Sequence, residues 1–406
     1  MKKSIQYQLS FMMFLEFFIW GGWFVTLGSF LGNNLSATGA ETGMAYSTQS
    51  WGAIIAPFII GLIADKFFNA EKILGVLHIV GAVLMYQMSQ STEFATFYPY
   101  VLGYMIAYMP TLALVNSVSF NQMKDPAKEF PLVRVFGTIG WILAGLIISF
   151  VFKWDSIENI GNGMLSNTFT MVAIASAVLG VFSFTLPKTP PKGKGEKTSI
   201  SDILGLDALK LLKDRNFLVF FVSSVLICIP LAFYYQNISP FLTEYKVENS
   251  TAWASIGQIS EVGFMLLLPF FFKKYGFKKT ILFGMLAWGI RYVLFAYGNA
   301  GDLFFMLVIG IALHGICYDF FFVSGQIYTD SKAGDKVKSA AQGLITLATY
   351  GIGMLVGFWV AGNIVDKNLL AEGTHSWQDV WMFPALFAIG VLIFFAVLFK
   401  NEKVEY

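Results

Sequence analysis

Long apolar runs, each near the length that crosses a bilayer, recur along almost the whole 406-residue chain. A transmembrane helix needs roughly 20 mostly apolar residues in succession. Twelve runs of that kind are predicted, at 8–32, 44–64, 72–90, 96–120, 131–152, 167–186, 215–243, 252–272, 279–297, 302–328, 338–362 and 377–399. They leave only short loops and no room for a soluble catalytic domain. The chain is therefore expected to be an all-α membrane protein with twelve transmembrane helices.

The composition agrees with a membrane protein and excludes other classes. Hydrophobic residues make up 56% of the chain and charged residues only 13%, about half the share usual in globular proteins. So few charges could not keep this much apolar surface in solution, and disorder requires the opposite balance. The two cysteines rule out a disulfide scaffold, and the net charge of +2 gives no reason to expect a nucleic-acid partner.

The lysines and arginines orient the helices. The first run could be a signal peptide, but it lacks a small-residue cleavage site, so a retained helix is expected. If the N-terminus is cytoplasmic, nearly all the Lys and Arg residues outside the runs lie on the cytoplasmic side. Only Lys153, Lys246 and Lys367 lie on the opposite side. An even number of helices then places both termini in the cytoplasm.

A basic stretch divides the helices into two halves of six. Residues 187–199 read PKTPPKGKGEKTS, which can neither pack nor span a membrane. The predicted division is an N-terminal six-helix bundle at 1–186, a cytoplasmic linker at 187–214 and a C-terminal six-helix bundle at 215–406. Within the linker, apolar residues at helical spacing over 200–211 fit either a short helix on the membrane surface or a solvated loop.

The two halves carry a faint repeat. PFIIGLIADKFFNAEKIL begins at Pro57, and PFFFKKYGFKKTIL begins at the corresponding place in the second half, at Pro269. Two parallel halves joined by a long basic loop resemble the major facilitator superfamily, in which the substrate lies between the halves. The GLIADK segment resembles the signature loop of that superfamily, with its basic cluster reduced to Lys66 and Lys72.

Ionisable residues inside the apolar runs are candidates for function, because burying a charge in a membrane is costly. They are Glu16, His78, Arg134, Glu261, Arg291, His314 and Asp319. This set contains three acids but only two arginines, so one carboxylate lacks a cationic partner when all three acids are ionised. An unpaired buried carboxylate takes up a proton, which is what a proton-coupled carrier requires.

Two helices carry polar residues on one face. Arg134, Thr138 and Trp141 share a stripe suited to a polar ring compound, although Arg134 lies near enough to its helix end to reach the membrane surface instead. Gln258 and Glu261 lie three apart near mid-span, where they fit either a ligand or a hydrogen bond between helices.

Further polar residues occur in the seventh, ninth and tenth runs. His314 and Tyr318 share one face, and Asp319 is turned about 100° from Tyr318. The polar cluster at 234–237 could line a cavity. A local hydrogen bond is expected for His78 and a structural ion pair for Arg291. No segment resembles a P-loop, a metal site or a nucleophile triad, so neither an ATP-driven pump nor an enzyme is expected.

Segments spread over nearly the whole chain resemble one family. They are FFIWGGWFVTLGSFL, GLIADK, AYMPTLALVNSVSF, FPLVRVFGTIGW, ILGLDA, GQISE, RYVLFAYG, YDFFFVSG, SAAQG and WQDVW. In this order they resemble the nucleoside–proton symporter family of the major facilitator superfamily. The resemblance implies proton-coupled import of nucleosides across the bacterial inner membrane by alternating access. It also implies that the protein needs no cofactor beyond the proton as coupling ion.

The resemblance assigns roles to individual residues. It implies that Arg134, Thr138, Gln258 and Glu261 contact the nucleoside and that Asp319 is tied to proton coupling. The chain departs from the family pattern at Trp141, where Phe is usual, at His314 and Tyr318, where Tyr and Phe are usual, and at Glu16, where an amide is usual. In the seventh helix, Tyr235 and Gln236 substitute for the family's Gln and Asn.

The expected protein is therefore a multi-pass carrier of the inner membrane, a monomer that binds a nucleoside-like small molecule. The expected substrate-binding residues are Arg134, Thr138, Trp141, Tyr235, Gln236, Gln258, Glu261, His314 and Tyr318. The proton is expected on Glu261, Asp319 or Glu16. The departures leave open a modified nucleoside, a sugar or a glycoside as substrate. A membrane receptor without net transport is the alternative from another class.

Overall fold

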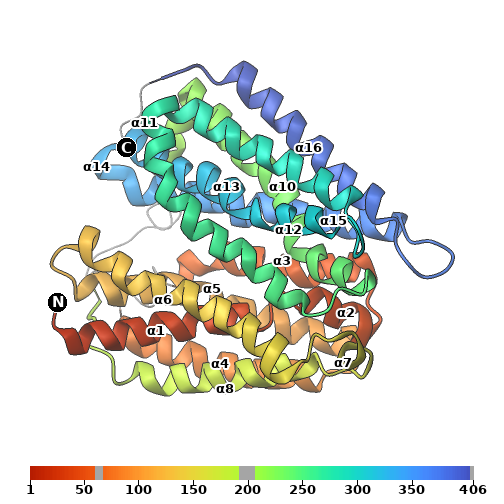
Figure 1. Cartoon of the computed structure of the whole chain (residues 1–406). Coiled ribbons are helices and arrows are strands. Elements are labelled where there is room, and N and C mark those ends of the chain that lie inside the picture. Colours follow the sequence, from red (N-terminus) through yellow and green to blue (C-terminus); the bar gives the residue numbers. More distant parts are fainter. Residues whose placement is uncertain (60–66, 192–205, 403–406) are drawn as a thin grey trace. The chain divides into compact units, whose positions relative to one another are not determined.

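The computed structural model describes residues 1–59, 67–191 and 206–402 (Figure 1). Helices account for most of these residues, and a single β-bridge joins Leu369 to His375. Nine helices of the described part are long and apolar enough to cross a membrane. The prediction of an all-α membrane protein is confirmed. The count of twelve helices and the cytoplasmic position of both termini stay predictions.

The chain forms two compact units. Unit 1 comprises Met1–Ala37, Thr48–Ser199 and Glu248–Ala252, and unit 2 comprises Thr38–Ser47, Ile200–Val247 and Trp253–Tyr406. The helices before residue 191 are α1 (Lys3–Gly21), α2 (Leu27–Leu35), α3 (Gly39–Ile59), α4 (Ala70–Gln90), α5 (Phe94–Asn121), α6 (Pro126–Leu146), the π-helical turn η2 (Ile147–Phe152), α7 (Ile157–Gly161) and α8 (Ser166–Ser183).

The helices after residue 205 belong to unit 2, apart from the first residues of α11. They are η3 (Leu206–Lys213), α10 (Arg215–Glu244), α11 (Ser250–Tyr297), α12 (Phe304–Ala312), α13 (His314–Tyr318), η4 (Asp319–Val323), α14 (Ser324–Thr346), η5 (Leu347–Gly353), α15 (Met354–Lys367) and α16 (Trp377–Leu398). η3 is a 3₁₀ helix, whereas η4 and η5 are π-helical.

Glycines determine how unit 1 packs. α1 lies along α6, and α4 lies between α5 and α8. A Cβ atom on Gly140 of α6 would lie 2.2 Å from the carbonyl oxygen of Phe14 in α1, so this approach tolerates no side chain. The close contact fixes the face of α6 that meets α1, and that face borders the polar stripe.

Two breaks inside long helices occur at glycines with positive φ. Gly276 (φ 74°) interrupts α11, and Gly334 (φ 64°) interrupts α14. Only glycine adopts this backbone region at low cost. The break at Gly276 falls in the predicted gap between the runs 252–272 and 279–297.

The first predicted run is interrupted. A single helix was expected over 8–32, but α1 ends at Gly21 and α2 begins at Leu27. Glycine weakens a helix, and Gly21 is followed by Gly22. A Cβ on Gly21 would lie 2.9 Å from the Trp141 ring, so packing against α6 favours glycine at the position where the helix ends.

Part of the predicted linker lies outside the described residues. The signature-like segment with Lys66 and the residues 192–205 are among those not described, so the domain boundaries stay a prediction. From Leu206 the chain forms the 3₁₀ helix η3, which packs against α14 and α10 with Ala208 fully buried. A short helix on the membrane surface and a solvated loop were the two alternatives for 200–211, and residues 206–211 lie in this 3₁₀ helix.

Candidate functional site

The polar stripe predicted for the fifth span lies on α6. Arg134, Thr138 and Trp141 are all half-buried, although they sit in an apolar helix. Partial burial keeps each side chain within reach of a small molecule and limits its contact with bulk water. These properties suit residues that bind a polar ligand.

Arg134 is held by an aromatic ring of α1. Its guanidinium carbon lies 4.1 Å from the centroid of the Phe17 ring, a cation–π contact. A Cβ on Gly137 would lie 2.7 Å from that ring and 2.8 Å from Arg134 Nη1, so glycine makes room for the pair. The stacking gives the Arg134 guanidinium a fixed orientation.

Trp141 extends the stripe. Its ring meets Trp20 of α1 edge-on, with centroids 5.7 Å apart, and Trp20 in turn meets Tyr108 of α5 at 5.8 Å. The three rings form an aromatic wall inside unit 1. Such a wall offers a face on which a planar base can stack.

Unit 2 gathers a second group of predicted residues. Tyr235 of α10 and Tyr318 of α13 both interact electrostatically with the Glu261 carboxylate of α11. The Tyr318 hydroxyl lies 2.8 Å from that of Tyr350 in η5, a residue that the sequence analysis did not single out. Three predicted residues from separate helices therefore lie near one another.

A close helix contact brings α13 onto α11. A Cβ on Gly315 would lie 2.6 Å from the backbone of Ser260, and the Gly315 N–H donates to Ser260 Oγ at 3.1 Å. His314 packs on Gly257 next to Gln258, which is half-buried. The glycines thus align the His314–Tyr318 face with the Gln258–Glu261 segment.

His314 has a partner that its sequence position does not suggest. Its Nδ1 lies 3.0 Å from Arg291 Nη1, and both residues are fully buried. Arg291 also lies 3.5 Å above the Tyr234 ring. The ion pair expected for Arg291 is not formed in the described part of the chain, where histidine and aromatic rings take the place of a carboxylate.

The Arg291 contact determines the tautomer of His314. A guanidinium can only donate, so Nδ1 must accept, and a neutral imidazole then carries its proton on Nε2. That Nε2 atom has no hydrogen-bond partner among the described residues. His314 therefore presents a buried N–H donor that a ligand could engage.

Asp319 is fully buried at the start of the π-helical turn η4. Neither carboxylate oxygen has a hydrogen-bond partner in the part of the chain that the structure describes, and Asp319 interacts electrostatically with Glu261. π-helical turns occur frequently at functional sites. A buried carboxyl group without hydrogen-bond partners is costly to keep and is therefore a candidate for function.

The Gln236 side chain points toward α15. With the amide oriented to satisfy both of its groups, its nitrogen donates to the Phe358 carbonyl and its oxygen accepts from the Gly362 N–H, each at 3.2 Å. Both partners belong to the backbone of α15. The side chain therefore joins two helices, whereas its neighbour Tyr235 faces the Glu261 group.

Glu16 pairs with His78 across unit 1. Glu16 Oε2 lies 2.8 Å from His78 Nε2, and both side chains are buried. The hydrogen bond of His78 was expected to be local, but the two bonds of its ring join α4 to α1 and to α8. Neither residue lies on the α6 stripe, although Glu16 immediately precedes Phe17.

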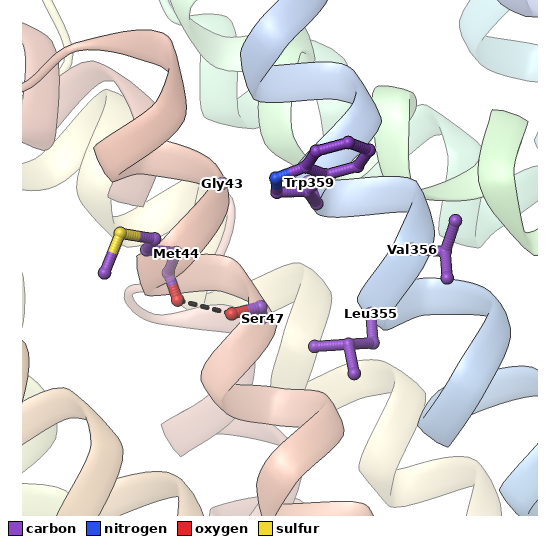
Figure 2. Close-up of a pocket in the computed structure, with 6 residues that line it drawn as sticks. All are labelled: Gly43, Met44, Ser47, Leu355, Val356 and Trp359. Atoms are coloured by element: carbon purple, nitrogen blue, oxygen red, sulfur yellow. Dashed lines mark hydrogen bonds between the residues drawn. The ribbon is translucent and has the colours of Figure 1, made fainter.

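A separate pocket of unit 2 is apolar. It is lined by Gly43, Met44, Ser47, Leu355, Val356 and Trp359. Figure 2 shows the Ser47 hydroxyl, which donates to the Met44 carbonyl at 2.7 Å instead of serving a ligand. None of the predicted site residues lines this pocket.

Apolar membrane-length helices that carry buried acids, a stacked arginine and half-buried polar residues define a membrane transporter. A family model described as nucleoside H⁺ symporter matches residues 2–404. The chain belongs to the nucleoside H⁺ symporter family.

Known relatives are similar over almost their full length. YegT, an inferred nucleoside transporter of Escherichia coli K12, is 44% identical, covering 98% of this chain and 94% of the relative. The xanthosine permease of the same organism is 34% identical, covering 99% of each chain. A crystal structure of a mutant of the nucleoside transporter NupG superposes with a TM-score of 0.90 at 31% identity, covering 98% of this chain and 100% of that one.

These comparisons confirm the predicted family, the major facilitator fold and the functional class. The chain is a proton-coupled nucleoside import transporter, a multi-pass protein of the bacterial inner membrane, and not an enzyme. Its ligand is a nucleoside-like small molecule.

Proposed function

We propose that this transporter binds its nucleoside through side chains of four helices. They are Arg134, Thr138 and Trp141 of α6, Tyr235 of α10, Gln258 and Glu261 of α11, and His314 and Tyr318 of α13. The observation that carries the proposal is the close contact of α13 with α11, which brings the His314–Tyr318 face beside Gln258 and Glu261. Gln236 is left out, because its amide is engaged by the α15 backbone.

Each residue has a role that follows from its chemistry. The Arg134 guanidinium, oriented by Phe17, donates to oxygens of the ribose or base. Trp141 offers a face to the planar base. The Glu261 carboxylate accepts hydrogen bonds from ribose hydroxyls, and Tyr318 donates or accepts beside it.

The coupling proton binds to Glu261, Asp319 or Glu16. Protonation of a buried acid removes its charge and so lowers the free energy of closing the cavity around a neutral substrate. Net import then proceeds by alternating access, with the protein acting as a monomer in the lipid bilayer.

The substrate is a nucleoside. Support comes from relatives that are named as a xanthosine permease and as the nucleoside permease NupG, both of Escherichia coli K12. Trp141, His314 and Tyr318 differ from the usual family residues, so the preferred base or a modification of it is expected to differ as well.

Uptake of labelled uridine, adenosine and xanthosine by proteoliposomes, with and without an inward proton gradient, tests the proposal. The gradient is expected to drive accumulation of at least one of the three, and Glu261→Gln is expected to reduce it more than tenfold. Glu244→Gln is the matched control, since this carboxylate pairs with His375 at the end of α10. Equal uptake by both variants would refute the role of Glu261.

Competition with other ligands separates the alternatives. Inhibition by ribose-free sugars, without inhibition by nucleosides, would assign the site to a glycoside carrier. Ligand binding without accumulation under any gradient would indicate a receptor.

A further inference from the structure

The interior of unit 1 contains an acid and an imidazole in direct contact. Glu16 is 0% exposed and His78 is 2% exposed, and their Oε2 and Nε2 atoms lie 2.8 Å apart. They come from different helices, α1 and α4. Two titratable groups buried together in a membrane protein mark a candidate proton-binding site.

Ser176 of α8 reveals where one proton of His78 lies. The Ser176 hydroxyl donates its single hydrogen to the backbone carbonyl of His78 at 2.9 Å. Toward His78 Nδ1, at 3.2 Å, the same oxygen can then only accept. His78 Nδ1 therefore carries a hydrogen, and Nε2 is the atom left to exchange a proton with Glu16.

The 2.8 Å contact itself requires a second proton. Without one, the Nε2 lone pair would face a carboxylate lone pair, which is repulsive at this distance. With one, the pair is either imidazolium with carboxylate or imidazole with carboxylic acid, and both forms are neutral overall. Loss of that proton changes the net charge of the pair from zero to one negative charge, which a membrane protein interior has to balance.

Two hydroxyl groups of α5 contact Glu16. Thr111 Oγ1 lies 2.6 Å from Glu16 Oε1, and the Tyr108 hydroxyl donates to the Glu16 backbone carbonyl at 2.8 Å. Tyr104 also interacts electrostatically with Glu16. The titratable groups facing the pair are thus two phenols of α5, and α8 contributes the Ser176 hydroxyl, while Arg134 of α6 interacts electrostatically with the Tyr108 phenol.

Arg134 links the pair to the proposed ligand site. It stacks on Phe17, the residue after Glu16, and it interacts electrostatically with Tyr108. One helical turn after Glu16, Trp20 contacts Trp141. A proton gained or lost at Glu16 therefore changes the field at the arginine that is proposed to bind the nucleoside.

We propose that Glu16 and His78 together form a proton-binding site that couples to nucleoside binding through Arg134. The proton arrives at the Glu16 carboxylate and is held as Oε2–H or Nε2–H. Its departure leaves a carboxylate and a neutral imidazole protonated on Nδ1, and the new negative charge changes the electrostatic field at Arg134 and so weakens nucleoside binding. The mechanism rests on the proposed function and adds His78 as the group that shares the proton.

Proteoliposomes that contain the full chain provide the transport test. Glu16→Gln and His78→Gln are expected to lower gradient-driven nucleoside accumulation more than tenfold, while nucleoside counterflow without a gradient falls less than threefold. Glu71→Gln, in a buried carboxylate that binds the Thr189 N–H at 2.8 Å, is the matched control and is expected to keep both activities.

The outcomes separate this inference from the proposed function. Full gradient-driven accumulation by Glu16→Gln would overturn the inference and leave nucleoside transport intact. Absence of counterflow in the wild-type protein would instead overturn the proposed function.

A spectroscopic measurement on the wild-type protein does not depend on the folding of a variant. The chain has three histidines, so ¹⁵N-histidine labelling gives a spectrum in which His78 can be assigned. His78 Nδ1 is expected to stay protonated at every pH, whereas the Nε2 signal shifts with pH and with bound uridine. An unprotonated Nδ1, or an Nε2 signal that neither pH nor ligand moves, would identify a purely structural pair.

Discussion

Arg291 donates a hydrogen bond to His314 Nδ1 at 3.0 Å, and this contact gives His314 the opposite tautomer from that of His78. In unit 1 the residue opposite the imidazole is a carboxylate, which accepts, and a proton is held between the two groups. In unit 2 the partner is a guanidinium, which only donates, so Nδ1 of that ring accepts. Of these two buried histidines, His78 is therefore suited to proton exchange and His314 to ligand binding.

Replacing His314 is expected to destabilise the protein more than replacing its partner Arg291. His314→Phe leaves the buried guanidinium without its acceptor and is expected to lower the free energy of unfolding by about 2 kcal/mol. Arg291→Met removes the charge itself and is expected to change stability little, because apolar replacements of buried charges are often neutral. The double variant should unfold closer to Arg291→Met than to His314→Phe. Thermal unfolding in detergent measures all three, and an Arg291→Met variant less stable than His314→Phe would contradict the assignment.

Phe17 is expected to affect substrate affinity although it carries no polar group. Phe17→Leu removes the ring on which Arg134 stacks, and loss of a cation–π contact worth about 1 kcal/mol corresponds to roughly a fivefold rise in KM for nucleoside uptake. Phe18→Leu changes the next residue along α1, for which the described contacts include Phe14 but not Arg134. A similar KM for both variants would show that the stacking does not orient the arginine.

Tyr350 is expected to tune the ligand site through Tyr318. Tyr350→Phe removes a hydroxyl 2.8 Å from that of Tyr318, and loss of one hydrogen bond of about 1 kcal/mol corresponds to roughly a fivefold rise in KM. Tyr297→Phe is the control, since that side chain is exposed at the end of α11. A changed maximal rate with constant KM would argue against a positioning role for Tyr350.

The Asp214 carboxyl group, which lies outside the membrane-spanning segments, is expected to make the stability of the protein depend on pH. Burial raises the pKa of Asp214, but the hydrogen bond from the Phe217 N–H and the nearby Lys332 ammonium outweigh it and hold the pKa below its usual value. Because the pKa is lowered on folding, the carboxylate stabilises the protein above the unfolded value of about 3.9. That stabilisation is lost as the pH falls through the folded value.

Two variants separate the charge of Asp214 from its role as helix cap. Asn also caps helices well, so Asp214→Asn is expected to be less stable than the wild type at pH 7, with a gap that closes below about pH 4. Asp214→Ala also loses the cap of α10 and is expected to cost about 1 kcal/mol more at either pH. Thermal unfolding midpoints at pH 7 and below about pH 4 measure the difference between the wild type and each variant. A difference between the wild type and Asp214→Asn that widens on acidification would contradict the lowered pKa of Asp214.

Apolar periodicity predicted the class of fold because a bilayer permits few alternatives to helices. It could not predict the end of α1 at Gly21, where α6 approaches, because hydropathy contains no information on helix packing. Similarly, the π-helical turn at Asp319 adds a residue to one turn, so a helical projection with a uniform period misplaces the residues that follow.

Side-chain partners were the least predictable part of the site. Three acids and two arginines suggested ion pairs, yet Glu16 contacts a histidine and so does Arg291. Tyr350 and Phe17 belong to residue types that are abundant in this chain, which has 17 Tyr and 42 Phe, so no sequence signal marked them. Helices that are far apart in the sequence lie close together in the fold, and this proximity gives these residues their roles.

The burial of both native cysteines has a practical consequence. Cys228 and Cys317 are the only thiols in the sequence, and they are 1% and 0% exposed. Maleimide and nitroxide reagents are therefore expected to leave the unmodified protein unlabelled. Pairs of cysteines introduced on exposed loops could carry spin labels or fluorophores in the otherwise native chain, so distance changes during a transport cycle could be followed without first building a cysteine-free variant.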